Sequence, residues 1–277
     1  MSAATADTSD KTHLYNCTQT AEGIDHFAAI GPEHLDFFHQ QGYLVIRQAF
    51  PRELIEAASQ AVTHLIDGGC PDYTGVQIEP EMRQDGLAAT ERHLSVRKIM
   101  GFVDYDERFP PLAAHPELLD LLERLMDDRP AMFQEMALLK PPHIGSEKPW
   151  HQDCAYFNVP LDTTVIGVWI ALDPATIENG CLHIVPGTHR EGPMPHFRRR
   201  DWQICDTDVE VDRNVAVPLE PGGCLLWHGL THHGSPPNHS AHPRGALQLH
   251  YQPSNAGKIS KEERNQLYGG EVLGAQC

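Results

Sequence analysis

In the first half of the chain, hydrophobic residues recur at helical spacing. In PRELIEAASQAVTHLIDGG (51–69) the apolar residues form one stripe, Pro51 stands at the start, and two glycines follow the last apolar residue. The stretches GPEHLDFFHQQG (31–42) and HPELLDLLERLMDD (115–128) have the same period. The pattern predicts three amphipathic helices that pack on a core, the first followed by a short strand, YLVI (43–46).

After about residue 130 the pattern changes to short apolar runs separated by Pro and Gly. The runs are MFQEMALLK (132–140), TTVIGVWIAL (163–172), GCLHIVPG (180–187), GGCLLWHGL (222–230) and GALQLHYQP (245–253). Repeated short strands of this kind are typical of an antiparallel sandwich or barrel. We therefore expect a mainly β fold with flanking helices, built as one domain over 26–277 with its β core at about 130–255. Residues 1–25 are small and polar, which predicts a flexible N-terminal arm.

Composition narrows the class of protein. The chain has 277 residues, with 21 basic and 38 acidic side chains, giving a net charge of −17 with histidines neutral. Such an acidic excess disfavours nucleic acid and anionic membranes as partners. The seven cysteines form no CxxC pair, and the start lacks the features of a secretory signal. We expect reduced thiols in the cytoplasm; the sequence does not determine the oligomeric state.

The stretch KPWHQDCAYF (148–157) contains the first candidate site. In a strand, His151 and Asp153 would point to the same side, because side chains alternate between faces. A third metal ligand could come from LLWHGLTHHGS (225–235), which offers histidines at 228, 232 and 233. Two imidazoles and one carboxylate form the facial triad of non-haem Fe(II) oxygenases, which leaves coordination positions open. Arg244 leads into a later strand, and its guanidinium suits a carboxylate ligand.

Three motifs in this order, HQDCAYF, ENGCLHIVPGTH and HGSPPNHSAHPRGALQLHY, resemble the phytanoyl-CoA dioxygenase family of Fe(II)/2-oxoglutarate oxygenases. The resemblance runs from about residue 34 to about residue 252 and implies a double-stranded β-helix, or jelly roll, with helical buttresses. One departure is GSPPN after the distal histidine, where the family often has a glycine two residues past the serine.

The resemblance also assigns residues. The family's HxD matches His151 and Asp153, and its distal histidine, which precedes Gly-Ser, matches His233. The residues that hold 2-oxoglutarate match Arg244, Ser235, Trp169, Lys98 and Met136. Relatives that halogenate lack the carboxylate, so Asp153 implies hydroxylation or another oxidation.

We therefore predict a dioxygenase that uses Fe(II), 2-oxoglutarate and O₂ to hydroxylate an unactivated C–H bond of a small molecule, releasing succinate and CO₂. Two alternatives remain: a non-catalytic jelly roll that binds metal or a small acid, and a cupin-like metalloenzyme independent of 2-oxoglutarate. A coenzyme A thioester is not an obvious substrate, because the sequence shows no basic cluster near the core. The run HFRRRDW (196–202) could bind an anionic group or form a solvated loop.

Overall fold

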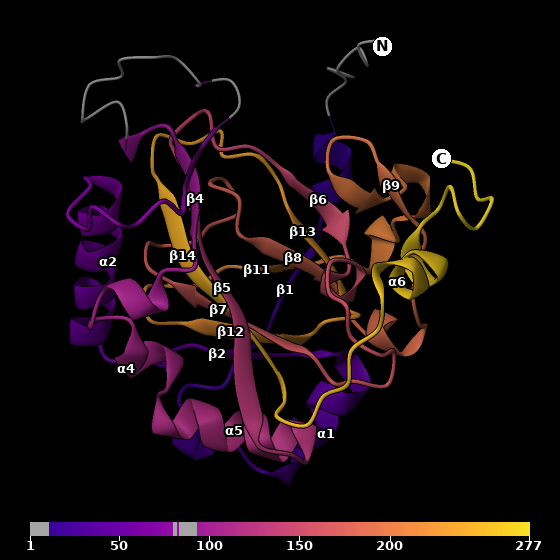
Figure 1. Cartoon of the computed structure of the whole chain (residues 1–277), viewed down its shortest axis with the longest axis horizontal. Coiled ribbons are helices and arrows are strands. Elements are labelled where there is room, and N and C mark those ends of the chain that lie inside the picture. The colour runs from indigo at the N-terminus through magenta and orange to yellow at the C-terminus, as the bar shows by residue number, and fades with distance from the viewer. Residues whose placement is uncertain (1–10, 80–81, 83–92) are drawn as a thin grey trace.

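The computed structural model of the chain describes residues 11–79, 82 and 93–277. Two β-sheets lie face to face, and helices cover the outer face of the larger one (Figure 1). This is the double-stranded β-helix expected from the sequence.

The larger sheet has seven strands. In spatial order they are β2 (Tyr43–Ile46), β12 (Cys224–His228), β7 (Ile166–Ala171), β14 (Arg244–Pro253), β5 (Pro130–Lys140), β4 (Val96–Met100) and β3 (Val76–Ile78). Alternate residues of β7 pack on different layers: Val168 and Ile170 meet the helices, whereas Trp169 and Ala171 face the smaller sheet. Because both faces are covered, the central strands are apolar without interruption, as the run VIGVWIAL indicates.

The smaller sheet has five strands and lies over the inner face of the larger one. Their spatial order is β1 (Gln19–Thr20), β11 (Val215–Val217), β8 (Leu182–Val185), β13 (His232–Ser235) and β6 (Lys148–His151). A separate hairpin consists of β9 (His196–Arg198) and β10 (Trp202–Ile204).

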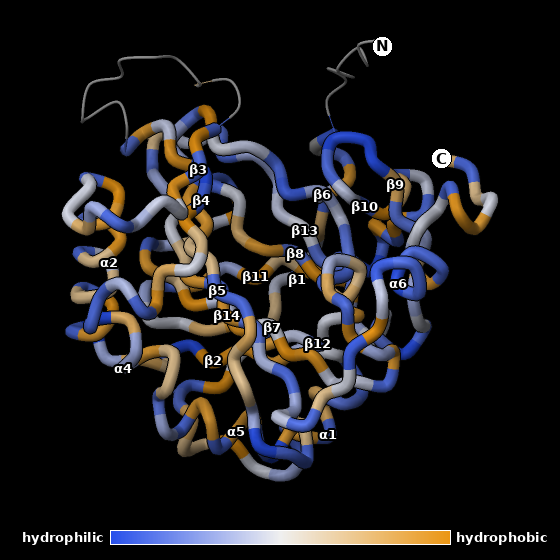
Figure 2. Tube along the Cα trace, in the orientation of Figure 1, coloured by the Kyte–Doolittle hydropathy of each residue, from blue (hydrophilic) through white to orange (hydrophobic). Residues whose placement is uncertain are grey.

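The predicted helices are present. They are α1 (Pro32–Gln41), α2 (Arg52–Ile66) and α5 (Pro116–Met126). The structure also has a short helix α4 (Pro110–Ala113) and, near the C-terminus, α6 (Lys261–Tyr268). The apolar stripes of α2 and α5 bury residues such as Ile55, Leu65 and Leu121 against the larger sheet. In Figure 2 the hydrophobic stretches follow the central strands and these helices, whereas α6 is hydrophilic. In the described residues, no helix has the length and apolar character needed to cross a bilayer.

Part of the expected N-terminal arm is packed against the domain. Residues 19–20 extend the smaller sheet as β1, in parallel with β11. The ring of Tyr15 stacks on that of Trp150 at 5.5 Å between centroids, and both side chains are buried. From residue 11 onward the arm is packed and not loose: Thr12–Tyr15 form a 3-10 helix, and the Tyr15 ring is buried against Trp150. Residues 1–10 lie outside the described residues.

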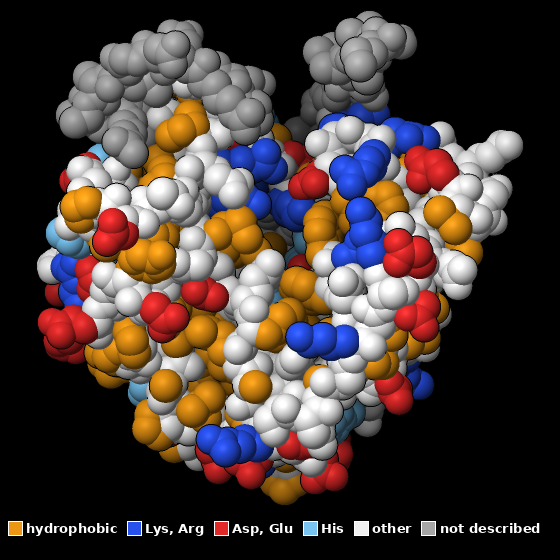
Figure 3. Space-filling view, viewed as in Figure 1, with side chains coloured by type: hydrophobic (Ala, Val, Ile, Leu, Met, Phe, Trp, Pro, Cys, Tyr) orange, Lys and Arg blue, Asp and Glu red, His pale blue; other side chains and the backbone are white. Residues whose placement is uncertain are grey.

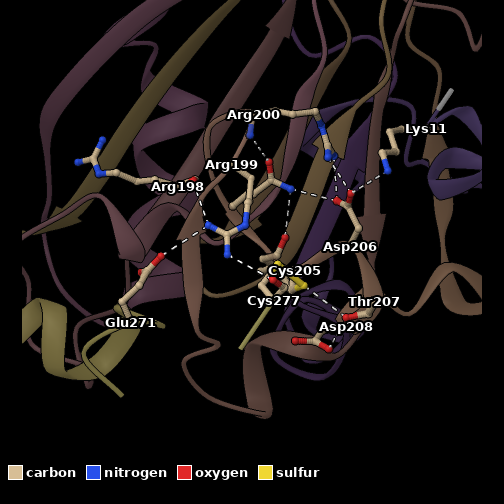
Figure 4. The surroundings of a disulfide bond; sticks show 12 residues. Lys11, Arg198, Arg199, Arg200, Cys205, Asp206, Thr207, Asp208, Glu271 and Cys277 are labelled. Carbon is tan, nitrogen blue, oxygen red and sulfur yellow. Dashed lines mark hydrogen bonds and ion pairs between the residues drawn. A yellow bond between two sulfur atoms is a disulfide. The ribbon is translucent and has the colours of Figure 1, made fainter. Parts of the chain in front are cut away.

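The expectation that all seven cysteines are reduced is wrong for one pair. Cys205, just after β10, forms a disulfide with Cys277 (Figure 4), whereas the other five cysteines are free. Scattered spacing gave no indication of this pair, because its two members are 72 residues apart and only the fold brings the C-terminal segment to the hairpin.

Candidate metal centre and cosubstrate pocket

His151 and Asp153 point to the same side for a slightly different reason from the one expected. Strand β6 ends at His151, and Asp153 opens a 3-10 turn, Asp153–Ala155. Gln152 between them keeps extended backbone (φ −110°, ψ 133°), so the alternation continues for one more residue. The Gln152 side chain points elsewhere and donates to the carbonyls of Gly192 and Leu230, both at 2.8 Å. These bonds anchor the turn that carries the carboxylate.

His233 joins this pair through the pairing of β13 with β6. The register places His233 directly opposite His151, and their ring centroids lie 4.2 Å apart. The Nε2 atoms of His151 and His233 lie 3.4 and 3.6 Å from the two carboxylate oxygens of Asp153. All three side chains are buried, and their donor atoms lie within 4.8 Å of one another. Among the described residues this is the one such cluster of potential metal ligands.

Both histidines are oriented by the same backbone device. Nδ1 of His151 hydrogen-bonds the carbonyl of Pro149 at 2.8 Å, and Nδ1 of His233 bonds that of Thr231 at 2.9 Å. Each carbonyl fixes the proton on Nδ1 and leaves the Nε2 lone pair facing the carboxylate. In both cases the carbonyl two residues earlier in the chain accepts the hydrogen bond that leaves Nε2 free to bind a metal.

The charges of the three groups suit a divalent metal. Burial lowers the pKa of His151 and brings that of His233 to about 3, so both imidazoles are neutral. Burial alone would raise the pKa of Asp153, but the neighbouring His233 and His250 hold that pKa well below its ordinary value. Two neutral imidazoles and one carboxylate are the protonation states in which these groups bind metal.

One carboxylate oxygen of Asp153 also contacts two side chains that were not assigned to the site from the sequence. Trp227 Nε1 donates to Oδ2 of Asp153 at 2.8 Å, and His250 Nε2 lies 3.0 Å from the same oxygen. The indole lies over Gly167, where a Cβ atom would come within 2.4 Å of the ring. These donors hold one oxygen of the carboxylate and leave the other for a metal. The sequence did carry a signal for His250: it follows Arg244 at an even spacing on one predicted strand, which places both side chains on the same face. For Trp227 there was no such signal.

The residues expected to hold 2-oxoglutarate lie around one cavity beside the triad. In the larger sheet, cross-strand register places Lys98 beside Leu138, and Met136 and Trp169 on either side of Gln248. Arg244 is on the same face two pairs further along, and Ser235 reaches the cavity from the smaller sheet. The cavity is about 240 Å³ and also exposes His151, Asp153 and His233. The fold therefore brings together all eight residues singled out for the site.

Arg244 is a buried cation without a carboxylate partner among the described residues. It is 2% exposed, its Nη1 donates to the carbonyl of Leu138 at 3.2 Å, and its Nε has no hydrogen-bond partner. Burial lowers the pKa of its guanidinium to about 10. The guanidinium stands 5.5 Å from the Trp169 ring, whose Nε1 is likewise buried without a partner. A buried charge with unused donors is costly unless an anion completes it, which is what a dicarboxylate would do.

Lys140 adds a second buried cation that sequence reasoning missed. Its position on β5 is paired with Arg244 on β14, and its Nζ donates to the carbonyls of Ser235 and Pro236. Burial, followed by the charge of Arg244, lowers the pKa of this amine well below its ordinary value. Lys140 thus ties the strand that carries Ser235 to the strand beside Arg244.

The remaining candidates lie elsewhere. The His228 ring contacts His189 at 5.2 Å, and neither His228 nor His232 is part of the cavity lining. In the basic run, Arg199 contacts Glu271 and the Cys277 carbonyl, and Arg200 pairs with Glu147 and Asp206 (Figure 4). Local ion pairs account for these two arginines, which favours a structural role for the run.

Fold and site together define a class, the jelly-roll oxygenases with a cluster of two histidines and one carboxylate, here with a buried arginine in the same cavity. Comparison with known proteins is consistent with this class. The family model described as "Phytanoyl-CoA dioxygenase (PhyH)" matches residues 38–246. The chain belongs to this family of iron- and 2-oxoglutarate-dependent dioxygenases.

Individual relatives are similar over most of their length. The chain is 33% identical to mouse phytanoyl-CoA dioxygenase domain-containing protein 1 (80% of this chain, 90% of that one) and 27% identical to Arabidopsis thaliana phytanoyl-CoA dioxygenase (84% and 93%). Among solved structures, EvdO2 from Micromonospora carbonacea in complex with 2-oxoglutarate has a TM-score of 0.67 at 25% identity (87% of this chain, 97% of that one). EctD from S. alaskensis, with 2-oxoglutarate and 5-hydroxyectoine, has a TM-score of 0.70 at 21% identity (91% and 83%).

Proposed function

We propose that this member of the family is an active hydroxylase whose iron is held by His151, Asp153 and His233. The observation that carries the proposal is the juxtaposition, in one cavity, of a buried neutral-histidine and carboxylate triad with a buried arginine that lacks a counter-ion. A metal explains the first feature, and an acid that binds next to the metal explains the second.

The cavity residues divide the work of binding the cosubstrate. Arg244 and Ser235 bind its distal carboxylate, and the free indole N–H of Trp169 supplies another donor nearby. Lys98 and Met136 line the same face and bound the cosubstrate from the larger sheet. When bound, Fe(II), 2-oxoglutarate and O₂ supply the oxidising power for C–H hydroxylation, with succinate and CO₂ as products. The protein orients the reactants and excludes water from the cavity.

Hydroxylation of a small molecule is the outcome we favour. Asp153 occupies the metal position that halogenating relatives leave open for chloride. The cavity of about 240 Å³ has room for the cosubstrate and a small reacting group, not for an enclosed coenzyme A thioester. EctD, a structural neighbour, was solved with 5-hydroxyectoine, which supports a small organic substrate here.

Anaerobic absorbance tests the proposal. Adding Fe(II) and then 2-oxoglutarate to the metal-free protein should produce the weak visible charge-transfer band of the chelate, and O₂ should discharge it with release of succinate. Asp153→Ala should abolish both signals while the protein remains folded. Iron binding without the band would contradict the role of Arg244 and favour the cupin-like enzyme, whereas a stable band that O₂ does not discharge would favour the non-catalytic binding protein.

We also propose a cytoplasmic location, supported by the five free cysteines among the described residues. The proposal requires the Cys205–Cys277 disulfide of the structure to be reduced in the cell. Alkylation of thiols in intact cells before lysis tests it. Cys205 and Cys277 should be found alkylated, since a reducing compartment opens their bond, whereas full protection of both would contradict this location.

A further inference from the structure

The cavity beside the metal centre carries more positive charge than iron and 2-oxoglutarate require. Its lining includes five cations and four acids. Iron and the cosubstrate bring equal and opposite charges, so with every side chain counted at its formal charge the lining has one more cation than acid, in a protein whose net charge is −17. The sequence did not reveal this cluster, because Arg97 and Lys98 are far from Lys140, Lys148 and Arg244 along the chain.

A β-bulge gives the cavity two consecutive cations. In the pairing of β3 with β4, Gln77 is opposite Lys98 and Ile78 is opposite Val96, so Arg97 has no partner residue in this pairing. Val96 and Ile99 both pack on the helix side although they are three residues apart. The extra residue lets Arg97 line the cavity together with Lys98, which strict alternation would forbid.

Three of the other charged groups that line the cavity are already paired, namely Lys148, Glu147 and Glu79. Lys148 forms an ion pair with Asp201 at 2.7 Å, and Glu147 pairs with Arg200 at the same distance. The carboxylate of Glu79 accepts hydrogen bonds from the backbone N–H and the hydroxyl of Ser146, at 3.1 and 2.6 Å.

Arg97 differs from these groups, because it has no hydrogen bond or ion pair with any residue in the described part of the chain. It is half-buried. Burial, followed by the charges of Lys148 and Arg97, lowers the pKa of Lys98. The cavity lining therefore includes the guanidinium of Arg97, which has no partner among the described residues, next to the amine of Lys98, whose pKa is lowered by burial and nearby cations.

Apolar side chains also line the cavity. The lining includes Met100, Leu139 and Phe157. A methionine side chain adapts readily to the shape of a ligand. Figure 3 shows a hollow in this face with Lys and Arg side chains gathered at one edge and hydrophobic side chains around the rest. A ligand that fits both edges has an acid group at one end and a hydrocarbon part directed toward the metal.

We propose that the substrate is a small organic acid whose carboxylate is bound by Arg97, and whose apolar part lies against Met100 and Phe157. The inference rests on the proposed hydroxylase function and specifies its substrate class. Lys98, the next residue of β4, lines the same cavity and is assigned to the cosubstrate.

Binding to the anaerobic protein saturated with Fe(II) and 2-oxoglutarate tests the proposal, since the cosubstrate then blocks Arg244. Hexanoate, octanoate and 3-phenylpropanoate are each compared with the corresponding primary amide by calorimetry. At least one acid should bind about tenfold or more tightly than its amide, as expected for a charge-assisted hydrogen bond. If no acid in the panel is preferred over its amide, the proposal is overturned.

Variants locate the preference. Arg97→Gln should reduce it to about twofold or less, whereas Arg97→Lys, which keeps the charge, should retain part of it. Arg52→Gln makes the same change of net charge at an 86%-exposed side chain on α2 and should leave the preference intact. A preference that survives in a folded Arg97→Gln protein would refute the assignment of Arg97. A sample that shows the chelate band but no acid preference overturns this inference alone; a sample without the band overturns the hydroxylase function beneath it.

Discussion

Replacing Trp227 by Phe tests how the metal-binding carboxylate is held. The change removes the indole N–H that donates to Asp153 at 2.8 Å and keeps an aromatic ring at a fully buried position. A hydrogen bond to a charged group contributes about 1.5–3 kcal/mol, and orienting partners of metal ligands affect affinity by about 10–100-fold. We expect the Kd for Fe(II) to rise by about tenfold or more, with His250 preventing complete loss.

The assay is an anaerobic Fe(II) titration against a competing chelator, with the Tm of each metal-free variant measured alongside. Trp150→Phe is the matched control, because its indole is also buried but donates to the carbonyl of Leu14 and not to a proposed metal ligand. This control should lose stability without losing iron affinity. Gly167→Ala should reproduce the iron defect independently, since the added Cβ displaces the Trp227 ring. Iron binding by Trp227→Phe as tight as in the wild type would refute the reasoning and leave the indole a packing role.

Three further predictions follow from buried groups. Arg244→Gln should raise the KM for 2-oxoglutarate by about 100-fold or more. It should also raise the Tm of the cosubstrate-free protein, because a buried unpaired charge is removed. An unchanged KM would exclude Arg244 from the cosubstrate site. Burial lowers the pKa of His183 to about 4 and that of His196 to about 3. Below pH 6.5 the unfolded chain therefore takes up protons that the folded protein cannot. Each of these histidines should lower the free energy of unfolding by up to about 1.4 kcal/mol per pH unit. Urea unfolding from pH 7 to pH 5 should show this fall, and His183→Asn should flatten it. Cys277→Ser should lower stability by about 2–4 kcal/mol under oxidising conditions, whereas with a thiol reductant present the variant and the wild type should have the same Tm.

Local patterns were reliable wherever one periodic stretch decides its own structure. The stripes of α2 and α5 and the runs that became β7, β12 and β14 all lie where hydrophobic spacing indicated. The spacing of His151 and Asp153 was also informative, although the strand stops at the histidine and the carboxylate stands on a turn. Periodicity shows which residues share a face, not where an element ends.

Patterns were unreliable where distant segments meet. The Cys205–Cys277 bond and the contact of Trp227 with Asp153 join residues more than seventy positions apart. No local rule links such pairs, because the distance between them is set by how the two sheets stack.

The sequence by itself determined the jelly-roll class, the helices that cover it and, through family resemblance, a set of candidate residues that line one cavity. These features survive because alternation and motif spacing are properties of short segments. Only the tertiary structure decided what surrounds those residues: the indole over Gly167 that holds Asp153, the buried guanidinium of Arg244 without an anion, and the bulge that turns Arg97 into the cavity. Burial, register and charge pairing are relations between elements, and they exist only once the sheets have packed.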